Sequence, residues 1–226
     1  MKIYKYGITL KRITHDDIEL LRKWRNSETV NSFMEYRDYI TVEMQERWFE
    51  SVNNYDNFYY IIIYKGKKVG LINDKNVERG KSAISEAGLF IAEEKYRNTH
   101  IPLLASLMMI ELNLFILKGE ISYIHVLKDN AQAIAYNKSL GYKLCDGQED
   151  VENQKYYLTP DNFDVKTAKI RKAASRLNDK KYPNGYVLFE KIDYELGIAQ
   201  KFEELVKTAA VNVIITKVPE GTMMVY

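Results

Sequence analysis

The sequence has one cysteine in 226 residues, Cys145. A single cysteine excludes an internal disulfide bond and is typical of a reducing compartment, so we expect a cytoplasmic protein. The net charge is also small, because 33 lysines and arginines nearly balance 31 aspartates and glutamates. A chain with so little net charge has no strong field for a polyanion, and we expect no nucleic-acid partner.

Long apolar runs are missing as well. The apolar stretch 101–117 is interrupted by Ser106, Glu111 and Asn113, and it falls short of the ~18 residues that a membrane span needs. We interpret it as a buried helix and expect no membrane span. Residues 1–5 contain no apolar core of a signal peptide, which agrees with the expected cytoplasmic location.

Residues for metal or thiol chemistry are scarce. The three histidines, His15, His100 and His125, are scattered and lack the spacing of metal ligands, so we predict no metal site. Cys145 has no identifiable base beside it, and a thiol nucleophile is not indicated.

What the sequence does have is ample material for a core. Hydrophobic residues make up 46% of the chain. Their spacing predicts alternating strands and helices in the order β-α-α-β-β-β-α-β-α-β over residues 8–158, where the last β is a hairpin of two short strands. The predicted strands are 8–14, 58–64, 69–72, 82–92, 121–127, 142–144 and 154–158, and the predicted helices are 15–26, 41–52, 100–118 and 130–141.

The stretch 85–142 organises the rest of the chain. It reads as a strand, a polar turn, a long apolar helix, a second strand, and a short helix opened by Asn130 and closed by Gly141. A helix N-terminus that follows a strand presents unpaired backbone N–H groups and the positive end of the helix dipole, which is a ready anion site. We therefore expect the chemistry of the protein in this stretch.

The chain changes character after residue 160. We predict a main domain over 1–160, a connecting basic helix and linker over 161–182, and a small β-α-β extension over 183–226. The extension is small for an independent domain, so we expect it to dock on the main body or on another subunit. Its apolar strand 211–218 suggests a homodimer.

Two motifs carry a resemblance to a known family. In 130–142, Asn130, Ala133, Tyr136, Lys138 and Gly141 resemble the late signature of the GNAT acyltransferase superfamily. The strand 85–91, which reads Ser-Glu-Ala-Gly-Leu-Phe-Ile, is similar to that family's fourth strand. The resemblance implies an α+β fold with a mixed sheet, the GNAT fold, and an acetyl-CoA-dependent N-acetyltransferase. It also implies that strand 85–91 splays away from strand 121–127, and that pantetheine lies in the gap between them.

The N-terminal region narrows the resemblance. Trp24, Arg25 and Asn26, followed downstream by Ile40-Thr41 and Trp48-Phe49, are similar to the branch that acetylates amino sugars on nucleotide carriers. This implies that Trp24, Arg25 and Asn26 contact the acceptor, with Arg25 at a diphosphate and Trp24 stacked on a ring. The alternative for the tryptophans is a place in the core.

The resemblance also implies a catalytic pair. Glu86 would act as general base, through a water, and Tyr136 would protonate the departing thiolate. From the residues alone, Glu86 is equally a solvent-facing strand residue. An aromatic placed like Tyr136, on a helix face with Ala133 and Leu140, is usually a core residue.

The implied cofactor contacts are Phe90, Ile91, Arg97, Asn98, Thr99, His100, Ile101, Asn130, Ala133 and Lys138. The loop from Arg97 to Pro102 departs from the family pattern, because His100 replaces a glycine and Pro102 replaces a second small residue. His100 adds bulk near a phosphate, and Pro102 removes one backbone N–H from the anion site.

Three hypotheses follow from these residues. The first is direct acetyl transfer to a small polar amine, with a nucleotide-linked amino sugar as the acceptor. The second keeps the reaction but takes a protein N-terminus or another small amine. The third is a GNAT-shaped binding module that has lost efficient catalysis, which the departed loop and the C-terminal extension motivate.

Overall fold

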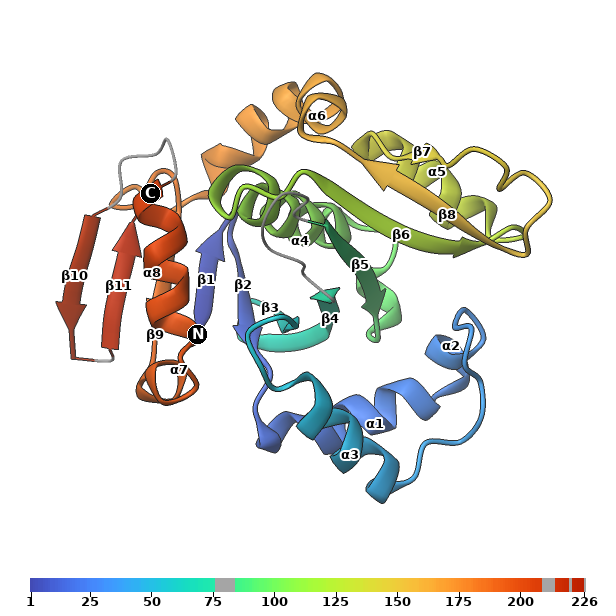
Figure 1. The fold of residues 1–226 in the computed structure, drawn as a ribbon, viewed down its shortest axis with the longest axis horizontal. Helices are drawn as coiled ribbons and strands as arrows, with labels where there is room; N and C mark the ends of the chain where they lie inside the picture. The colour runs from blue at the N-terminus through green and yellow to red at the C-terminus, as the bar shows by residue number, and fades with distance from the viewer. Residues whose placement is uncertain (76–83, 209–213, 220, 226) are drawn as a thin grey trace.

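The computed structural model describes residues 1–75, 84–208, 214–219 and 221–225. Within these residues, one mixed sheet runs through the molecule in the order β10-β11-β9-β1-β2-β3-β4-β5-β6-β8-β7 (Figure 1). The strands are β1 (Lys2–Lys5), β2 (Ile8–Arg12), β3 (Phe58–Tyr64), β4 (Lys67–Lys75), β5 (Ile84–Ile91), β6 (Ile121–Leu127), β7 (Lys143–Leu144), β8 (Asn153–Leu158), β9 (Tyr186–Phe189), β10 (Ile214–Val218) and β11 (Gly221–Val225). The α+β class with a large mixed sheet, predicted from the sequence, is confirmed.

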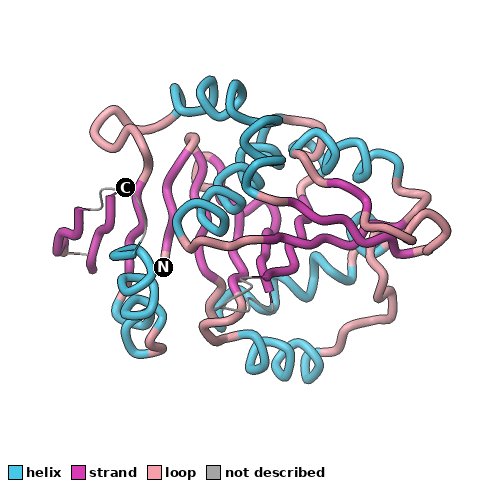
Figure 2. The backbone as a smooth tube through the Cα atoms, turned by 45° about the horizontal axis from the view of Figure 1, so that its top comes forward, coloured by secondary structure: helices cyan, strands magenta, loops and turns pink. Residues whose placement is uncertain are grey.

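Helices cover both faces of this sheet (Figure 2). They are α1 (Ile18–Asn26), α2 (Glu28–Asn31), α3 (Val42–Val52), α4 (His100–Glu111), α5 (Ala131–Leu140), α6 (Pro160–Ala174), α7 (Lys191–Glu195) and α8 (Ile198–Thr208), with short turns η1 (His15–Asp17), η2 (Glu94–Tyr96), η3 (Leu112–Ile116) and η4 (Ser175–Leu177). The predicted helices at 15–26, 41–52, 100–118 and 130–141 all correspond to helices of the structure.

The central strand β3 explains the two-sided arrangement. Its seven residues are all apolar or aromatic, so both of its faces must be covered. Tyr60 and Ile62 join the larger core beneath α4, α6 and α8. Tyr59 and Ile61 join the smaller core beneath α1 and α3 on the opposite face. The alternation of side chains along one strand therefore supplies both cores.

Both helices of the organising stretch begin with a side-chain cap, and α5 begins and ends at the predicted residues. The Thr99 side chain caps α4 by accepting from the Ile101 N–H, and the Asn130 side chain caps α5 by accepting from the Ala133 N–H. Gly141 ends α5 with a φ of 106°, a left-handed conformation that favours glycine. Local capping chemistry thus fixes where both helix N-termini lie.

The strand β1 was not predicted, and it joins the C-terminal extension to the body. Tyr6 and Gly7, with φ of 56° and 73°, make the tight turn from β1 to β2. The other edge of β1 pairs with β9, so β9, β11 and β10 continue the main sheet. The short run Ile3-Tyr4-Lys5 gave too little alternation to identify the strand.

The extension contains more elements than the predicted β-α-β. Its order in the described residues is β9-α7-α8-β10-β11. A reciprocal capping box between Glu190 and Asp193 ends β9 and starts the short helix α7. Residues 211–213 of the predicted last strand lie outside the described residues. Ile214, with 65% of its side chain exposed, begins the outer strand β10, and dimerisation through it stays a prediction.

A gap opens in the middle of the sheet between β5 and β6. The two strands run parallel and pair only at Ile84–Ile121, Ser85–Ser122 and Glu86–Tyr123. Beyond these pairs they diverge, as Figure 1 shows, while β5 stays paired with β4 up to Ile91 and β6 with β8 up to Leu127. The splay implied by the family resemblance is therefore present.

Candidate functional site

The gap between β5 and β6 contains a cavity of about 950 Å³. Side chains from both faces of the sheet line it. One wall comes from α1, α3 and the loop between α2 and α3, and the other comes from α4 and α5. Glu86 and Tyr136 both line this cavity, so the two predicted catalytic residues share one space.

A buried polar cluster forms the closed end of the gap. Asn113, in the π-turn that follows α4, donates to Asp74 on β4 and to Ser85 on β5, the latter at 2.7 Å. On the next strand, the Ser122 hydroxyl lies 3.2 Å from the Tyr142 hydroxyl. These contacts anchor β4, β5 and β6 where β5 and β6 are still paired, and the gap begins beyond the next pair, Glu86–Tyr123.

Glu86 lies at the point where the strands part. Its Oε1 is 3.0 Å from Lys75 Nζ and 3.4 Å from His125 Nδ1, and 29% of its side chain is exposed. Tyr59 lies close enough to Glu86 for the carboxylate and burial together to raise the pKa of the Tyr59 hydroxyl, with burial as the larger cause. Since Tyr59 belongs to the core beneath α1 and α3, Glu86 faces that side of the sheet.

Tyr136 approaches the cavity from the opposite side. It projects from α5 and packs against the larger core, and its hydroxyl donates to Ser106 Oγ on α4 at 2.7 Å. Burial raises the pKa of Tyr136, and the hydrogen bond to Ser106 offsets only part of this effect. The phenol therefore stays protonated at neutral pH, with its O–H directed at Ser106.

The edge of β5 beyond Glu86 supplies backbone groups. Ala87 to Ile91 have no strand partner on the β6 side within the described residues. Free edge N–H and C=O groups favour an extended ligand that pairs with them like a strand. Phe90 and Ile91, predicted to hold the cofactor through their backbone, lie on this edge and line the cavity.

The loop before α4 reaches the cavity with only some of its predicted residues. Arg97 and Asn98 line it. Arg97 Nε donates to the Ile91 carbonyl at 3.0 Å, so this arginine also holds the end of β5. Thr99 is occupied in capping α4, and neither its side chain nor that of His100 or Ile101 lines the cavity.

His100 and Ile101 are turned away for identifiable reasons. The His100 ring packs edge-on against Tyr64, with ring centroids 6.0 Å apart. Ile101 is buried in the larger core. Their side chains are therefore not directed at the cavity. The Ile101 N–H already donates to Thr99 Oγ1, and Pro102, which does line the cavity, has no N–H to offer.

The start of α5 forms the neighbouring part of the same wall. Asn130 and Ala133 line the cavity, whereas the Lys138 side chain is exposed and lies outside it. Gln132 Nε2 donates to Asn98 Oδ1 at 2.9 Å, which joins the start of α5 to the loop before α4. Two helix N-termini thus meet at this wall, an arrangement suited to a phosphate-bearing ligand.

Arg25 is the charged group of the opposite wall. Its guanidinium is half-buried, and burial lowers its pKa, although an arginine remains charged. Nη2 lies 3.4 Å from the Tyr36 carbonyl, and Nε has no hydrogen-bond partner among the described residues. No carboxylate pairs with Arg25 in the part of the chain that the structure describes. A buried, unpaired cation facing a cavity is suited to an anionic group of a ligand.

The two residues predicted beside Arg25 have structural roles instead. Trp24 does not line the cavity, because its ring packs edge-on against Phe90 in the smaller core, with centroids 6.2 Å apart. Asn26 does not line it either. Its side-chain amide accepts from the Ile40 N–H and donates to the Ile40 carbonyl, both at 2.9 Å. Asn26 therefore fixes the loop that carries Tyr36 beside Arg25.

The polar residues of the cavity that were not predicted as site residues include His125, Ser106, Gln132 and Tyr59. His125 and Ser106 were visible in the sequence only as an isolated histidine and as a polar interruption of an apolar run. Their partners, Glu86 and Tyr136, are distant in sequence, and only the fold brings each pair together.

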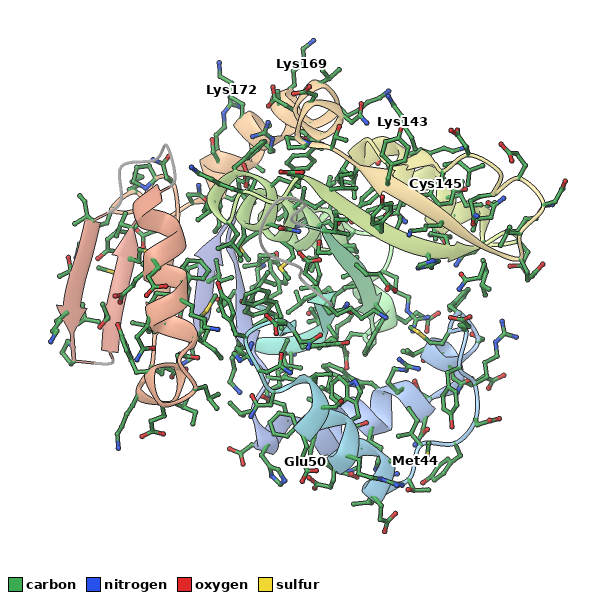
Figure 3. The ribbon with its side chains drawn as sticks, in the orientation of Figure 1. Met44, Glu50, Lys143, Cys145, Lys169 and Lys172 are labelled. Carbon is green, nitrogen blue, oxygen red and sulfur yellow. The ribbon has the colours of Figure 1, made fainter. Side chains whose placement is uncertain are left out.

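The predicted basic helix is α6. Lys169 and Lys172 point outward from it, away from the body of the molecule (Figure 3). Among the described residues, no group of three or more His, Cys, Asp or Glu side chains is placed to hold a metal ion. No helix within the described ranges has the length and apolar character to cross a membrane.

Comparisons with known proteins agree with this geometry. The family model described as acetyltransferase (GNAT) domain matches residues 10–157. No curated protein matches the sequence. Among solved structures, apo FdhC, a nucleotide-linked sugar GNAT, is 18% identical, covers 75% of this chain and 96% of its own, and has a TM-score of 0.63.

Two further structures have similar folds. Mycobacterium smegmatis RimJ, solved in complex with CoA-disulfide, is 14% identical, with 78% of this chain and 94% of its own covered and a TM-score of 0.61. The aminoglycoside acetyltransferase AAC(6')-Ib, solved with coenzyme A, is 15% identical, with 70% and 98% covered and a TM-score of 0.58. At these identities the likeness shows the fold.

Proposed function

The chain belongs to the GNAT acetyltransferase family, and we propose that it transfers an acetyl group from acetyl-CoA directly to a primary amine of an anionic acceptor, a nucleotide-linked amino sugar. The observation that carries the proposal is the shared cavity, which has Glu86 at one side of the open β5 edge and Tyr136 at the other. This arrangement fits a reaction in which an amine loses a proton and a thiolate gains one.

Acetyl-CoA fits the wall formed by the starts of α4 and α5. The open edge of β5 pairs with the extended pantetheine, and its backbone N–H groups polarise the acetyl carbonyl. The phosphates lie at the two helix N-termini, where Arg97, Asn98, Asn130 and the helix dipoles favour negative charge. Both RimJ and AAC(6')-Ib, which share the fold, were solved with forms of coenzyme A.

The reaction needs no covalent intermediate on the protein. The acceptor nitrogen bonds to the carbonyl carbon, the carbon–sulfur bond breaks, and Tyr136 gives its proton to the sulfur. Glu86 supplies the negative charge that draws the proton from the amine on the other side of the gap. The phenol is protonated before each turnover, as this role requires.

The wall on the α1 and α3 side, which we call the acceptor wall, favours a substrate that carries a positive amine and a negative group. An amine placed toward Glu86 leaves the remainder of the molecule toward Arg25, whose charge is unpaired in the described residues. Trp48 and Tyr59, with rings edge-on at 5.1 Å, give this wall aromatic surface for a sugar or base. A phosphate-linked amino sugar matches these features, and FdhC, a nucleotide-linked sugar GNAT, shares the fold.

The test is binding followed by turnover. Calorimetry with acetyl-CoA should show micromolar binding, and a thiol-release assay should show turnover with UDP-linked amino sugars. Aminoglycosides, which carry amines but no anionic group, and a peptide N-terminus serve as competing acceptors. Turnover of the peptide alone would favour protein N-terminal acetylation. Absence of acetyl-CoA binding at millimolar concentration would contradict the proposal and leave a binding module with this fold.

A further inference from the structure

Three charged or titratable side chains from adjacent strands meet where the sheet opens. Lys75 on β4 is the register partner of Glu86 on β5, and Glu86 is in turn the partner of Tyr123 on β6. His125 lies two residues beyond Tyr123 and so points to the same face. Its Nδ1 is 3.4 Å from the Glu86 Oε1 that also pairs with Lys75 at 3.0 Å.

We infer that His125 is the residue that accepts the proton from the acceptor amine, and that Glu86 is the residue that positions it. This inference rests on the proposed function and assigns the base within that site. His125 lines the same cavity as Tyr136 and Arg25. With Nδ1 toward the carboxylate, the remaining ring nitrogen, Nε2, is available to the amine.

The pairing of Glu86 favours this assignment. Lys75 Nζ already lies 3.0 Å from Glu86 Oε1, so this carboxylate oxygen is engaged by a cation. His125 Nδ1 lies 3.4 Å from the same oxygen, which positions the ring and leaves Nε2 for the amine.

The surroundings of His125 also provide a route for the proton to leave. The His125 side chain is 36% exposed, so the charged ring can pass its proton to water.

The groups that face the Glu86–His125 pair are Lys75 on β4, Tyr59 on β3 and Lys155 on β8. Lys155 is the register partner of His125. Lys155 Nζ lies over the Tyr123 ring at 3.9 Å, which holds its charge beside the strand pair.

The protons balance in this scheme. A protonated amine has three N–H bonds and the product amide has one. One proton goes to His125 Nε2 and then to solvent. The second replaces the proton that Tyr136 gave to the sulfur. No oxidant, metal or further reactant is needed.

Kinetics over a range of pH test the assignment, with UDP-linked amino sugar and acetyl-CoA as substrates. His125→Gln should lower kcat about 100-fold, while acetyl-CoA affinity and acceptor KM change less than about threefold. It should also remove the acid limb of the kcat/KM profile, which arises when the base becomes protonated. Glu86→Gln should lower kcat about tenfold and keep an acid limb, because the histidine remains.

His15→Gln is the matched control. His15 Nε2 also pairs with a carboxylate, Glu46, at 3.0 Å, but it lies outside the cavity. This variant should keep the wild-type profile. Loss of the acid limb in Glu86→Gln rather than in His125→Gln would overturn the inference and make the carboxylate the base.

A second measurement does not depend on turnover. Long-range 15N–1H NMR spectra of histidine-labelled protein resolve three rings, and the signal missing from His125→Gln identifies His125. The neutral ring should carry its proton on Nδ1 in the wild type and lose that preference in Glu86→Gln. A proton on Nε2 in the wild type would refute the inference, whereas failure of the proposed function would appear separately as absence of acetyl-CoA binding.

Discussion

The two walls of the cavity hold their polar groups in different ways. The wall formed by α4 and α5 uses helix caps, backbone N–H groups and short-range contacts such as Arg97 with the end of β5. The wall on the α1 and α3 side uses charged side chains from separate elements, with Arg25 from α1 and Glu86 from β5. The first wall is built from local geometry, and the second depends on the whole sheet.

Under the proposed function, this difference separates the tasks of the walls. Caps and dipoles recognise phosphate and backbone-like groups, which every reaction with coenzyme A presents. Separate charged side chains recognise one particular acceptor. Changes on the α4 and α5 wall should therefore act on cofactor binding or on the leaving thiolate, and changes on the α1 and α3 wall should act on the acceptor.

The largest expected effect is on the α4 and α5 wall. Tyr136→Phe should lower kcat by about 100-fold with unchanged acetyl-CoA affinity, because the proton donor is lost and the ring still fills its place. Ser106→Ala keeps the phenol and should cost less than about tenfold. Steady-state kinetics with calorimetry measure both. A kcat within threefold of wild type in Tyr136→Phe would mean that solvent protonates the thiolate.

Asp17 tests how the acceptor wall is attached to the sheet. It lies at the start of α1 and pairs with Lys11 at 2.7 Å and Lys68 at 2.6 Å. Burial opposes its ionisation, but hydrogen bonds from Lys11, Lys68 and the Thr14 N–H outweigh burial and lower its pKa. Asp17→Asn should lower the free energy of unfolding by about 2 kcal/mol, because both ion pairs are lost. The loss is no larger because both lysines can still reach water.

The sign of the pH dependence follows from the lowered pKa of Asp17. The folded protein binds this proton less readily than the unfolded chain, so its stabilisation is complete above the unfolded pKa and is lost as the pH falls through the folded one. Denaturant unfolding from pH 7 down to pH 3 should show the wild type approaching Asp17→Asn. If the difference in unfolding free energy between the two proteins does not change with pH, the ion pairs of Asp17 contribute nothing.

The same contrast explains what the sequence could and could not predict. Caps at Thr99 and Asn130 and the left-handed Gly141 are signals within one turn of helix, and the structure has each of them. The pairing of β1 with β9 joins residues far apart in the chain, and no local pattern encodes it. Trp24 illustrates the remaining difficulty, because a tryptophan at a helix end suits a ligand and a core equally until Phe90 is placed against it.

Two arginines, one on each wall, test whether each wall binds a different substrate. Arg25→Met should raise the acceptor KM about 20-fold and leave acetyl-CoA affinity unchanged, because a buried charged hydrogen bond to the acceptor is lost. Arg97→Met should raise the acetyl-CoA Kd about tenfold with little effect on acceptor KM. Calorimetry and acceptor titrations separate the two. If both variants weaken the same ligand, the two walls do not divide the substrates.

The smallest expected effect is a gain in acetyl-CoA affinity, from a change in the loop that departs from the family pattern. Pro102→Ala adds a backbone N–H at a position that lines the cavity, so acetyl-CoA should bind about threefold more tightly. His100→Gly restores the family residue but should change the Kd less than twofold, because the His100 ring already packs on Tyr64 away from the cavity. Calorimetry on the two variants decides which departure matters. Tighter acetyl-CoA binding in His100→Gly than in Pro102→Ala would mean that the imidazole obstructs the phosphates. The missing N–H of Pro102 would then not be the departure that weakens cofactor binding.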